Sequence, residues 1–386
     1  MSQQNPPPQG QPSFQGPPSY PASPYPGQPA PAQPYPGHPQ YPGEHHQAQV
    51  QYSGQPPIVW YPHADRPSEL PVVPREYHEF YRTPRLRWWH PLVALLGFGF
   101  AWLVAVLLVS LAALFYDIAV GSYAFVDLTA ADIPITPALF LANNVGLALA
   151  IPLALGIQRL VFKQRGGWLF SIAGRLRWGL LGRFMLVTLV LYVVLIAVEL
   201  LTGGVPTDLS VRPETWFLLV SILLTTPLQS AGEEVALRGL LARSIGAWFP
   251  ASRVGLVVST AVTSAVFMVL HGAGDPWLNL QYVCFGVVAS VLVWKTGGLE
   301  APIALHVVNN LIGLSVVPFT GLDGLFDREA GVGSPLVLVQ VVVLVAAAAG
   351  MLWQARRLGL PTSAAPAAPA GTVDAHEPPG SRPAWG

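Results

Sequence analysis

The chain has 386 residues, of which 20 are acidic and 20 are basic, so its formal net charge is zero. This balance excludes a strongly basic nucleic-acid-binding surface, and the sequence contains no RNA- or DNA-binding motif. Charged residues make up only 10% of the chain and hydrophobic residues 52%, a combination that is typical of a membrane protein.

Residues 1–85 form a first region whose composition differs from that of the rest of the chain. They contain most of the 40 prolines and repeat a Tyr-Pro-Gly unit that begins at Tyr25, Tyr35 and Tyr41. Proline removes backbone donors and glycine adds chain entropy, so this composition cannot build an apolar core. We predict a disordered cytoplasmic tail of polyproline character, which we interpret as a spacer. The alternative is a tail that binds a partner domain with an aromatic groove.

Eight apolar stretches follow, each close to the ~20 residues that are needed to cross ~30 Å of hydrocarbon. They cover approximately residues 91–116, 137–161, 179–201, 215–241, 254–271, 277–295, 299–317 and 335–354. We therefore predict an all-α integral membrane protein whose transmembrane domain covers residues 86–357. We predict that residues 358–386 form a disordered C-terminal tail.

Basic residues occur before the first stretch, in every second connection between stretches and after the last stretch. In chain order these connections hold Arg82, Arg85 and Arg87; Arg159, Lys163, Arg165, Arg175 and Arg177; Arg243 and Arg253; Lys295; and Arg356 and Arg357. The connections between them are acidic or neutral. Because basic loops stay on the cytoplasmic side, this alternation predicts eight spans in the plasma membrane with both termini in the cytoplasm.

The fourth stretch contains three charged residues, Glu233, Glu234 and Arg238, inside apolar sequence. An ionisable residue at the centre of a membrane helix costs about 2.5–3.5 kcal/mol on the mildest insertion scales, so these residues need a role. Glu234 and Arg238 are four positions apart, share one helix face and are predicted to form an ion pair. Glu233 is turned about 100° away on the helix and does not pair with Arg238. A carboxylate without this partner is suited to proton transfer.

Only two of the nine histidines, His271 and His306, belong to the apolar region. His271 follows Phe267 by four positions, and His306 precedes Asn310 by four, so each pair shares a helix face. Two carboxylates, an arginine, two imidazoles and an amide supply a base, an orienting group and oxyanion donors. Together they are the side chains that a hydrolase site requires.

Three motifs occur in order over roughly residues 215–317: Glu-Glu-x-x-x-Arg, then Phe-x-x-x-His, then His-x-x-x-Asn. In this order the segment resembles the CPBP (Abi) family of intramembrane glutamic or metallo-endopeptidases, which includes the type II CAAX prenyl endopeptidases. The resemblance implies a membrane-embedded helical fold and a peptide-hydrolysing site.

The resemblance also implies roles for individual residues. Glu233 would activate water with the help of His271, while His306 and Asn310 would stabilise the oxyanion. The predicted ion pair of the fourth stretch would orient these groups. A mechanism without a cofactor and one with a divalent metal such as zinc both stay open, with Glu233, His271 and His306 as the zinc ligands. The only cysteine, Cys284, allows neither an internal disulfide nor a cysteine-based zinc site.

The depth of these residues constrains the helices. Counted at ~1.5 Å per residue from the cytoplasmic ends, Glu233 lies ~15–20 Å deep but His271 lies ~27 Å deep. We therefore expect that the fourth helix is tilted and extends to about Ala247, or that the fifth span begins later than residue 254.

The function that these features predict is an intramembrane endopeptidase acting on membrane-associated proteins or peptides. The sequence shows no His-Glu-x-x-His zinc motif, no Gly-x-Gly-Asp and no Gly-x-Ser-x-Gly. One alternative is a non-catalytic membrane scaffold or an immunity or regulatory protein of the same fold. Another is a proton-coupled transporter that uses Glu233 and the histidines as a relay, although the two halves show no self-similarity.

Overall fold

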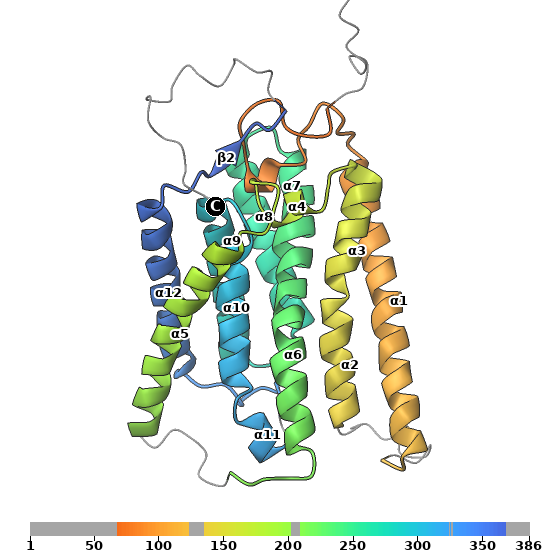
Figure 1. Ribbon diagram of the computed structural model, residues 1–386, viewed down its shortest axis with the longest axis vertical. Coiled ribbons are helices and arrows are strands. Elements are labelled where there is room, and N and C mark those ends of the chain that lie inside the picture. The colour runs from red at the N-terminus through yellow and green to blue at the C-terminus, as the bar shows by residue number, and fades with distance from the viewer. Residues whose placement is uncertain (1–67, 123–134, 202–208, 324, 326, 368–386) are drawn as a thin grey trace, which may run out of the picture. The chain divides into compact units, whose positions relative to one another are not determined.

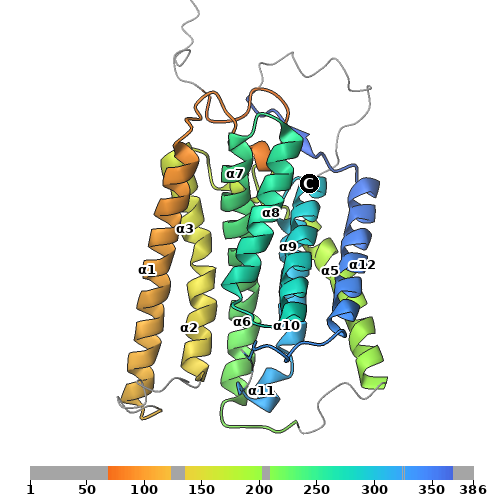
Figure 2. The same cartoon turned by 180° about the vertical axis from the view of Figure 1, so that it is seen from behind.

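The computed structural model describes residues 68–122, 135–201, 209–323, 325 and 327–367. These residues form a bundle of helices that run side by side along one direction (Figures 1 and 2). The described residues contain two short strands, β1 (Arg75–Glu76) and β2 (Ser363–Ala364), which pair antiparallel. This architecture confirms the predicted all-α membrane fold. The greater parts of the two predicted tails, 1–67 and 368–386, lie outside the described residues.

The helices follow one another along the chain, some of them in direct continuation. In chain order they are η1 (Tyr77–Glu79), α1 (His90–Ala119), α2 (Pro137–Ala148), α3 (Ala150–Ile157), η3 (Gln158–Phe162), α4 (Gly167–Phe170), α5 (Trp178–Leu201), α6 (Thr215–Glu234), η4 (Val235–Leu241), α7 (Ala242–Trp248), α8 (Ser252–Leu270), α9 (Pro276–Thr296), α10 (Glu300–Gly313), α11 (Val317–Thr320) and α12 (Val337–Arg357). η1 is a 3₁₀ helix, whereas η3 and η4 are π-helical stretches.

Eight helical segments of the described chain are long and apolar enough to cross a membrane, as predicted. They are His90–Ala119, Pro137–Phe162, Trp178–Ala197, Thr215–Trp248, Ser252–Leu270, Pro276–Thr296, Glu300–Thr320 and Val337–Arg357. Large apolar side chains such as Leu103 and Leu107 on α1 point outward and are 65% and 55% exposed. Helices satisfy their own backbone groups, and the outward apolar faces suit lipid, so the chain is a multi-pass membrane protein.

The fourth span is longer than the apolar stretch suggested, because α6, η4 and α7 continue one another from Thr215 to Trp248 over 34 residues. This length confirms the expectation that the helix extends to about Ala247. The fifth span begins at Ser252, so the alternative of a later start is wrong. The π-helical stretch η4 begins directly after Glu234, and such wide turns within α-helices are frequent at functional sites.

The predicted boundary of the N-terminal tail at residue 85 is wrong, because residues 68–85 fold onto the bundle. Tyr77, Phe80 and Tyr81 are fully buried and surround the guanidinium of Arg243 on α7. The guanidinium carbon lies 5.0, 5.2 and 4.2 Å from the three ring centroids, respectively. Three aromatic rings and a buried cation thus give this proline-rich segment the core that its composition does not suggest.

The predicted start of the C-terminal tail at residue 358 is also too early. Residues 358–367 are described, and β2 within them pairs with β1, while the Ala367 amide donates to the Pro71 carbonyl at 3.1 Å. Backbone hydrogen bonds therefore hold both segments at one end of the bundle (Figure 1).

The first part of α10 is enclosed by the bundle, since every residue from Glu300 to Val308 is buried. It packs against α5, α6 and α9. An ion pair fixes its start: the Arg177 guanidinium donates to the Glu300 carboxylate at 2.7 Å, and Glu300 lies in the first turn of the helix. This packing places His306 and Asn310 of α10 inside the bundle.

Candidate active site

The predicted site residues lie on three spans that meet inside the bundle. Glu233 and Glu234 end α6 and Arg238 lies in η4, both in the fourth span. His306 and Asn310 face them from α10, and His271 directly follows α8. Close approach of the backbones positions this part of α6: a side chain at Gly232 would collide with the backbone of Leu147 at the end of α2.

A buried charge network forms the centre of the site. Glu234 is 0% exposed, and its Oε1 accepts from Arg238 Nη1 at 2.9 Å and lies 2.8 Å from Nδ1 of His306. The predicted ion pair of Glu234 and Arg238 is therefore present. Because a buried carboxylate needs compensation by charge and hydrogen bonds, these two contacts explain why Glu234 is tolerated inside the bundle.

Glu233 occupies a different environment from its neighbour. Its side chain keeps 13% exposure, it accepts a hydrogen bond from the Gln229 amide one turn earlier, and its Oε2 lies 3.8 Å from Nε2 of His306. His306 thus lies between the two carboxylates, with one ring nitrogen toward each. The carboxylate that is accessible is the one that the sequence predicts as the base.

The Asn310 amide is fixed by a chain of hydrogen bonds. Its Nδ2 donates to Gln229 Oε1 and to Ser230 Oγ, both at 3.2 Å, and its Oδ1 accepts from Asn309 Nδ2 at 3.0 Å. The Tyr192 hydroxyl on α5 in turn donates to Asn309 Oδ1 at 2.7 Å. This chain directs the donor end of Asn310 toward α6, on the side of Glu233.

Sequence reasoning did not assign roles to Gln229, Ser230, Asn309 or Tyr192. A signal existed for Gln229 and Ser230, since they are polar and lie one turn or less before Glu233 in an apolar span. No comparable signal marks Tyr192, because α5 carries it into the site from another part of the chain. These four uncharged side chains hold the predicted groups in place by hydrogen bonds.

His271 lies beside the network and does not join it by a hydrogen bond or ion pair. Its Nδ1 lies 2.7 Å from the Phe267 carbonyl, and its ring packs 4.4 Å from the Phe267 ring and 4.0 Å from the Tyr282 ring. The Phe267 ring lies 5.8 Å from that of His306. Phe267 therefore links the two imidazoles by packing, and Nδ1 of His271 is engaged by a carbonyl.

The donor geometry does not fit a zinc ion bound by Glu233, His271 and His306. Among the described residues, the group of three ligand atoms that lie within 4.8 Å of one another belongs to Glu76, His78 and Glu79, at the end of the bundle where β1 and β2 pair. The arrangement is that of a hydrogen-bonded set, and we derive no catalytic step through a metal.

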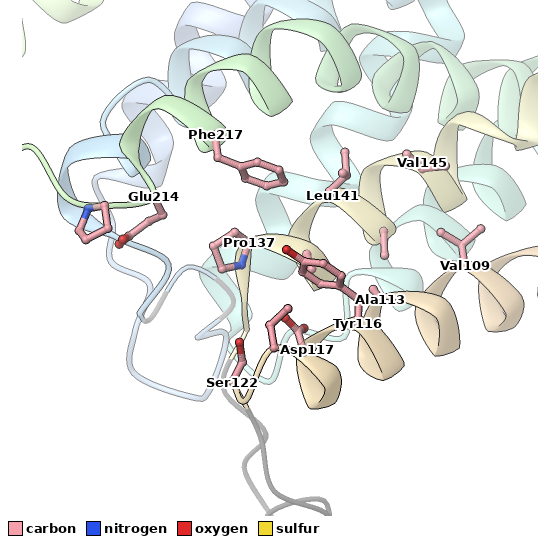
Figure 3. A pocket seen from close by; sticks show the side chains of 14 residues that line it. Val109, Ala113, Tyr116, Asp117, Ser122, Pro137, Leu141, Val145, Glu214 and Phe217 are labelled. Carbon is pink, nitrogen blue, oxygen red and sulfur yellow. The ribbon is translucent and has the colours of Figure 1, made fainter.

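A separate cleft of about 650 Å³ lies between α1, α2 and the start of α6. Most of its lining is apolar, and the carboxylates of Asp117 and Glu214 are among its side chains (Figure 3). None of the predicted site residues lines it. The cleft and the buried charge network are therefore distinct features of the bundle.

Residues 214–312 match the family described as type II CAAX prenyl endopeptidase Rce1-like. This range contains all seven residues that the motifs name, so the match confirms the resemblance predicted from the sequence. The matched range covers α6 to α10 and thus the helices that build the site.

One relative of this chain is the protein named "Uncharacterized protein YyaK" from Bacillus subtilis (strain 168). The two are 26% identical over 137 residues, which cover 31% of this chain and 42% of that protein. The similarity thus spans less than half of the relative's length. No solved structure matches the chain.

Proposed function

We propose that this protein is an intramembrane endopeptidase that hydrolyses peptide bonds of membrane-associated proteins or peptides. The observation that carries the proposal is the pair formed by Glu233 and His306, whose Oε2 and Nε2 lie 3.8 Å apart on two different helices. A further hydrogen bond orients each of them: Gln229 donates to Glu233, and Nδ1 of His306 contacts Glu234. The match of residues 214–312 to an endopeptidase family supports the same assignment.

In the proposed reaction Glu233 takes a proton from a water molecule, whose oxygen attacks the carbonyl carbon of the scissile bond. His306 acts in its protonated form: Glu234 holds Nδ1–H, and Nε2–H donates to the carbonyl oxygen as negative charge develops there. The Asn310 amide is a second donor once substrate displaces its present partners. Glu233 then passes its proton to the amine that leaves. The assistance of His271 to Glu233 stays a prediction.

Charge balance supports this assignment of protonation states. With His306 protonated, the network holds two negative carboxylates and two positive groups, Arg238 and His306. Its summed charge is zero, as burial of charged groups requires. Of the two carboxylates, that of Glu233 keeps 13% exposure, as a base that must reach water requires, whereas that of Glu234 is fully buried.

We also propose that the protein lies in the plasma membrane with both termini in the cytoplasm. The pairing of β1 with β2 at one end of the bundle supports a common side for both termini, as an even number of spans requires. Protease protection of tags at each terminus in sealed vesicles tests the orientation. A partner for the proline-rich residues 1–67 is part of the same proposal and would act from the cytoplasm.

Comparison of protein N-termini in membranes tests the enzymatic proposal. Cells produce the wild-type chain, Glu233→Gln or Glu329→Gln at equal levels; Glu329 is exposed and outside the site, so it is a matched control. New N-termini with the wild type and Glu329→Gln, but not with Glu233→Gln, would establish proteolysis and identify substrates. The same N-termini in all three, with Glu233→Gln still functional in cells, would favour a scaffold or an immunity or regulatory protein.

A further inference from the structure

A second group of polar side chains lies in the N-terminal segment, far in sequence from the proposed active site. Glu76, His78 and Glu79 each offer a ligand atom, and these atoms lie within 4.8 Å of one another. His78 and Glu79 are both 4% exposed. The group belongs to β1 and η1, and η1 packs against α7, α8 and α9.

The imidazole of His78 has a nitrogen without a partner. Its Nε2 lies 3.0 Å from the Ser252 carbonyl oxygen, which only accepts, so Nε2 carries the proton. Its Nδ1 is buried, has no hydrogen-bond partner and lies 3.9 Å from Oε2 of Glu76. In the neutral ring this tautomer leaves a lone pair on Nδ1, on the side of the Glu76 carboxylate. A lone pair and a carboxylate oxygen repel each other, and a cation that binds both atoms would remove this repulsion.

We propose that Glu76, His78 and Glu79 bind a divalent cation of the zinc class, which holds β1 and η1 in one conformation. A zinc ion has ligands at about 2.0–2.2 Å, so two of its donor atoms are at most about 4.3 Å apart. The 3.9 Å between Nδ1 and Oε2 satisfies this limit. The proposal does not depend on the endopeptidase function.

Surrounding hydrogen bonds orient the ligands as metal sites require. Glu76 Oε1 accepts from the Trp294 indole at 2.9 Å, and Glu76 Oε2 from the Ser252 hydroxyl at 3.2 Å. The His78 ring donates to a backbone carbonyl through the nitrogen that does not face the site. These contacts come from the start of α8 and the end of α9, so hydrogen bonds hold the two ligands Glu76 and His78 against both helices.

Charge decides which class of cation fits. Arg82 and Arg75 both contact Oε1 of Glu79, at 2.9 and 3.4 Å, which leaves Oε2 of this carboxylate for an ion. Two arginines offset the two carboxylates, so a hard cation such as Ca²⁺ or Mg²⁺, which depends on carboxylate charge, gains little here. A neutral imidazole nitrogen selects zinc and similar metals instead.

Zinc binding by the purified full-length chain in detergent tests the proposal. Equilibrium dialysis against Zn²⁺ compares the wild type with His78→Gln, which keeps a donor for Ser252 but removes Nδ1, and with Glu76→Gln. We expect both variants to lose one bound ion or to bind it at least about tenfold more weakly. His90→Gln controls for the loss of a histidine, and histidines of the N-terminal region contribute the same background to every variant.

Two further measurements distinguish this site from zinc binding elsewhere in the chain. Glu233→Gln should retain the ion, since it lies in the proposed active site; loss of the ion there and not in His78→Gln would overturn the assignment. Zn²⁺ should raise the unfolding temperature of the wild type but not of Glu76→Gln, because only the folded wild type holds the site. Equal zinc content and equal stabilisation in wild type, His78→Gln and Glu76→Gln would also overturn it.

Discussion

Arg238 and Arg243 lie on the same continuous span and are 1% and 0% exposed, yet the protein compensates them in different ways. Arg238 donates to the carboxylate of Glu234, which also binds His306. Arg243 forms no ion pair with a described carboxylate. It lies over three aromatic rings and donates to the Trp168 carbonyl at 2.8 Å.

The surroundings of Arg238 form a network of compensated charges, whereas those of Arg243 attach the N-terminal segment to the bundle. Around Arg238 every buried charge has an opposite partner, so removal of one partner leaves another charge uncompensated. Around Arg243 the partners are neutral, and each ring or carbonyl contributes separately. We infer that the charge network fails as a unit, whereas the aromatic cage formed by Tyr77, Phe80 and Tyr81 weakens step by step.

The largest effect is expected for Glu234→Gln, which leaves Arg238 and His306 without their carboxylate. Breaking a buried ion pair on one side costs about 3–5 kcal/mol, so the free energy of unfolding should fall by about that amount. Denaturant unfolding of the full-length chain in detergent measures it. Glu329→Gln, the same change at an exposed position, should leave the stability unchanged.

A double variant sharpens this test. Glu234→Gln with Arg238→Met removes both members of the pair, so no uncompensated arginine remains and part of the lost stability should return. If the single variant is as stable as the wild type, the pair does not stabilise the fold. The inference that the charge network around Arg238 fails as a unit would then be wrong.

A smaller effect is expected for Arg243→Ala. It removes the cation from the three rings, and the loss should be about 2 kcal/mol, mostly as local release of residues 75–82. Hydrogen exchange of this segment should rise while exchange in α10 stays slow. Arg243→Lys keeps the charge but loses the planar guanidinium, so its stability should lie between those of the wild type and Arg243→Ala. Unchanged exchange in Arg243→Ala would mean that other contacts hold the segment.

The sequence predicted the parts of the fold that depend on neighbouring residues. Each span is a local run of apolar residues, and the ion pair of Glu234 and Arg238 follows from four positions on one helix. The folding of residues 68–85 could not be predicted in this way. Its three aromatic residues are diluted by prolines, and their cation, Arg243, lies more than 160 positions away in the chain.

The sequence also predicted only part of the site. The motifs name the residues that form the network, but not how they pair: the contact of His306 with Glu234 depends on how α10 packs against α6. The sequence predicts that His271 assists Glu233, but no hydrogen bond joins the two side chains. The Nδ1 of His271 instead contacts the Phe267 carbonyl. Helix periodicity shows which residues share a face but not which faces meet.

The smallest effect is expected for Tyr192→Phe, which tests whether neutral hydrogen bonds matter in the charged region as they do around Arg243. The hydroxyl holds Asn309, and Asn309 in turn orients the amide of Asn310. Loss of one such bond is worth about 1 kcal/mol, so kcat on a cleaved peptide should fall about fivefold with KM little changed. Tyr116→Phe, the same change at an exposed position, should leave both constants unchanged. An equal fall in both variants would remove Tyr192 as a positioning residue, whereas a fall in Tyr192→Phe alone would show that the network depends on uncharged contacts beyond its four charges.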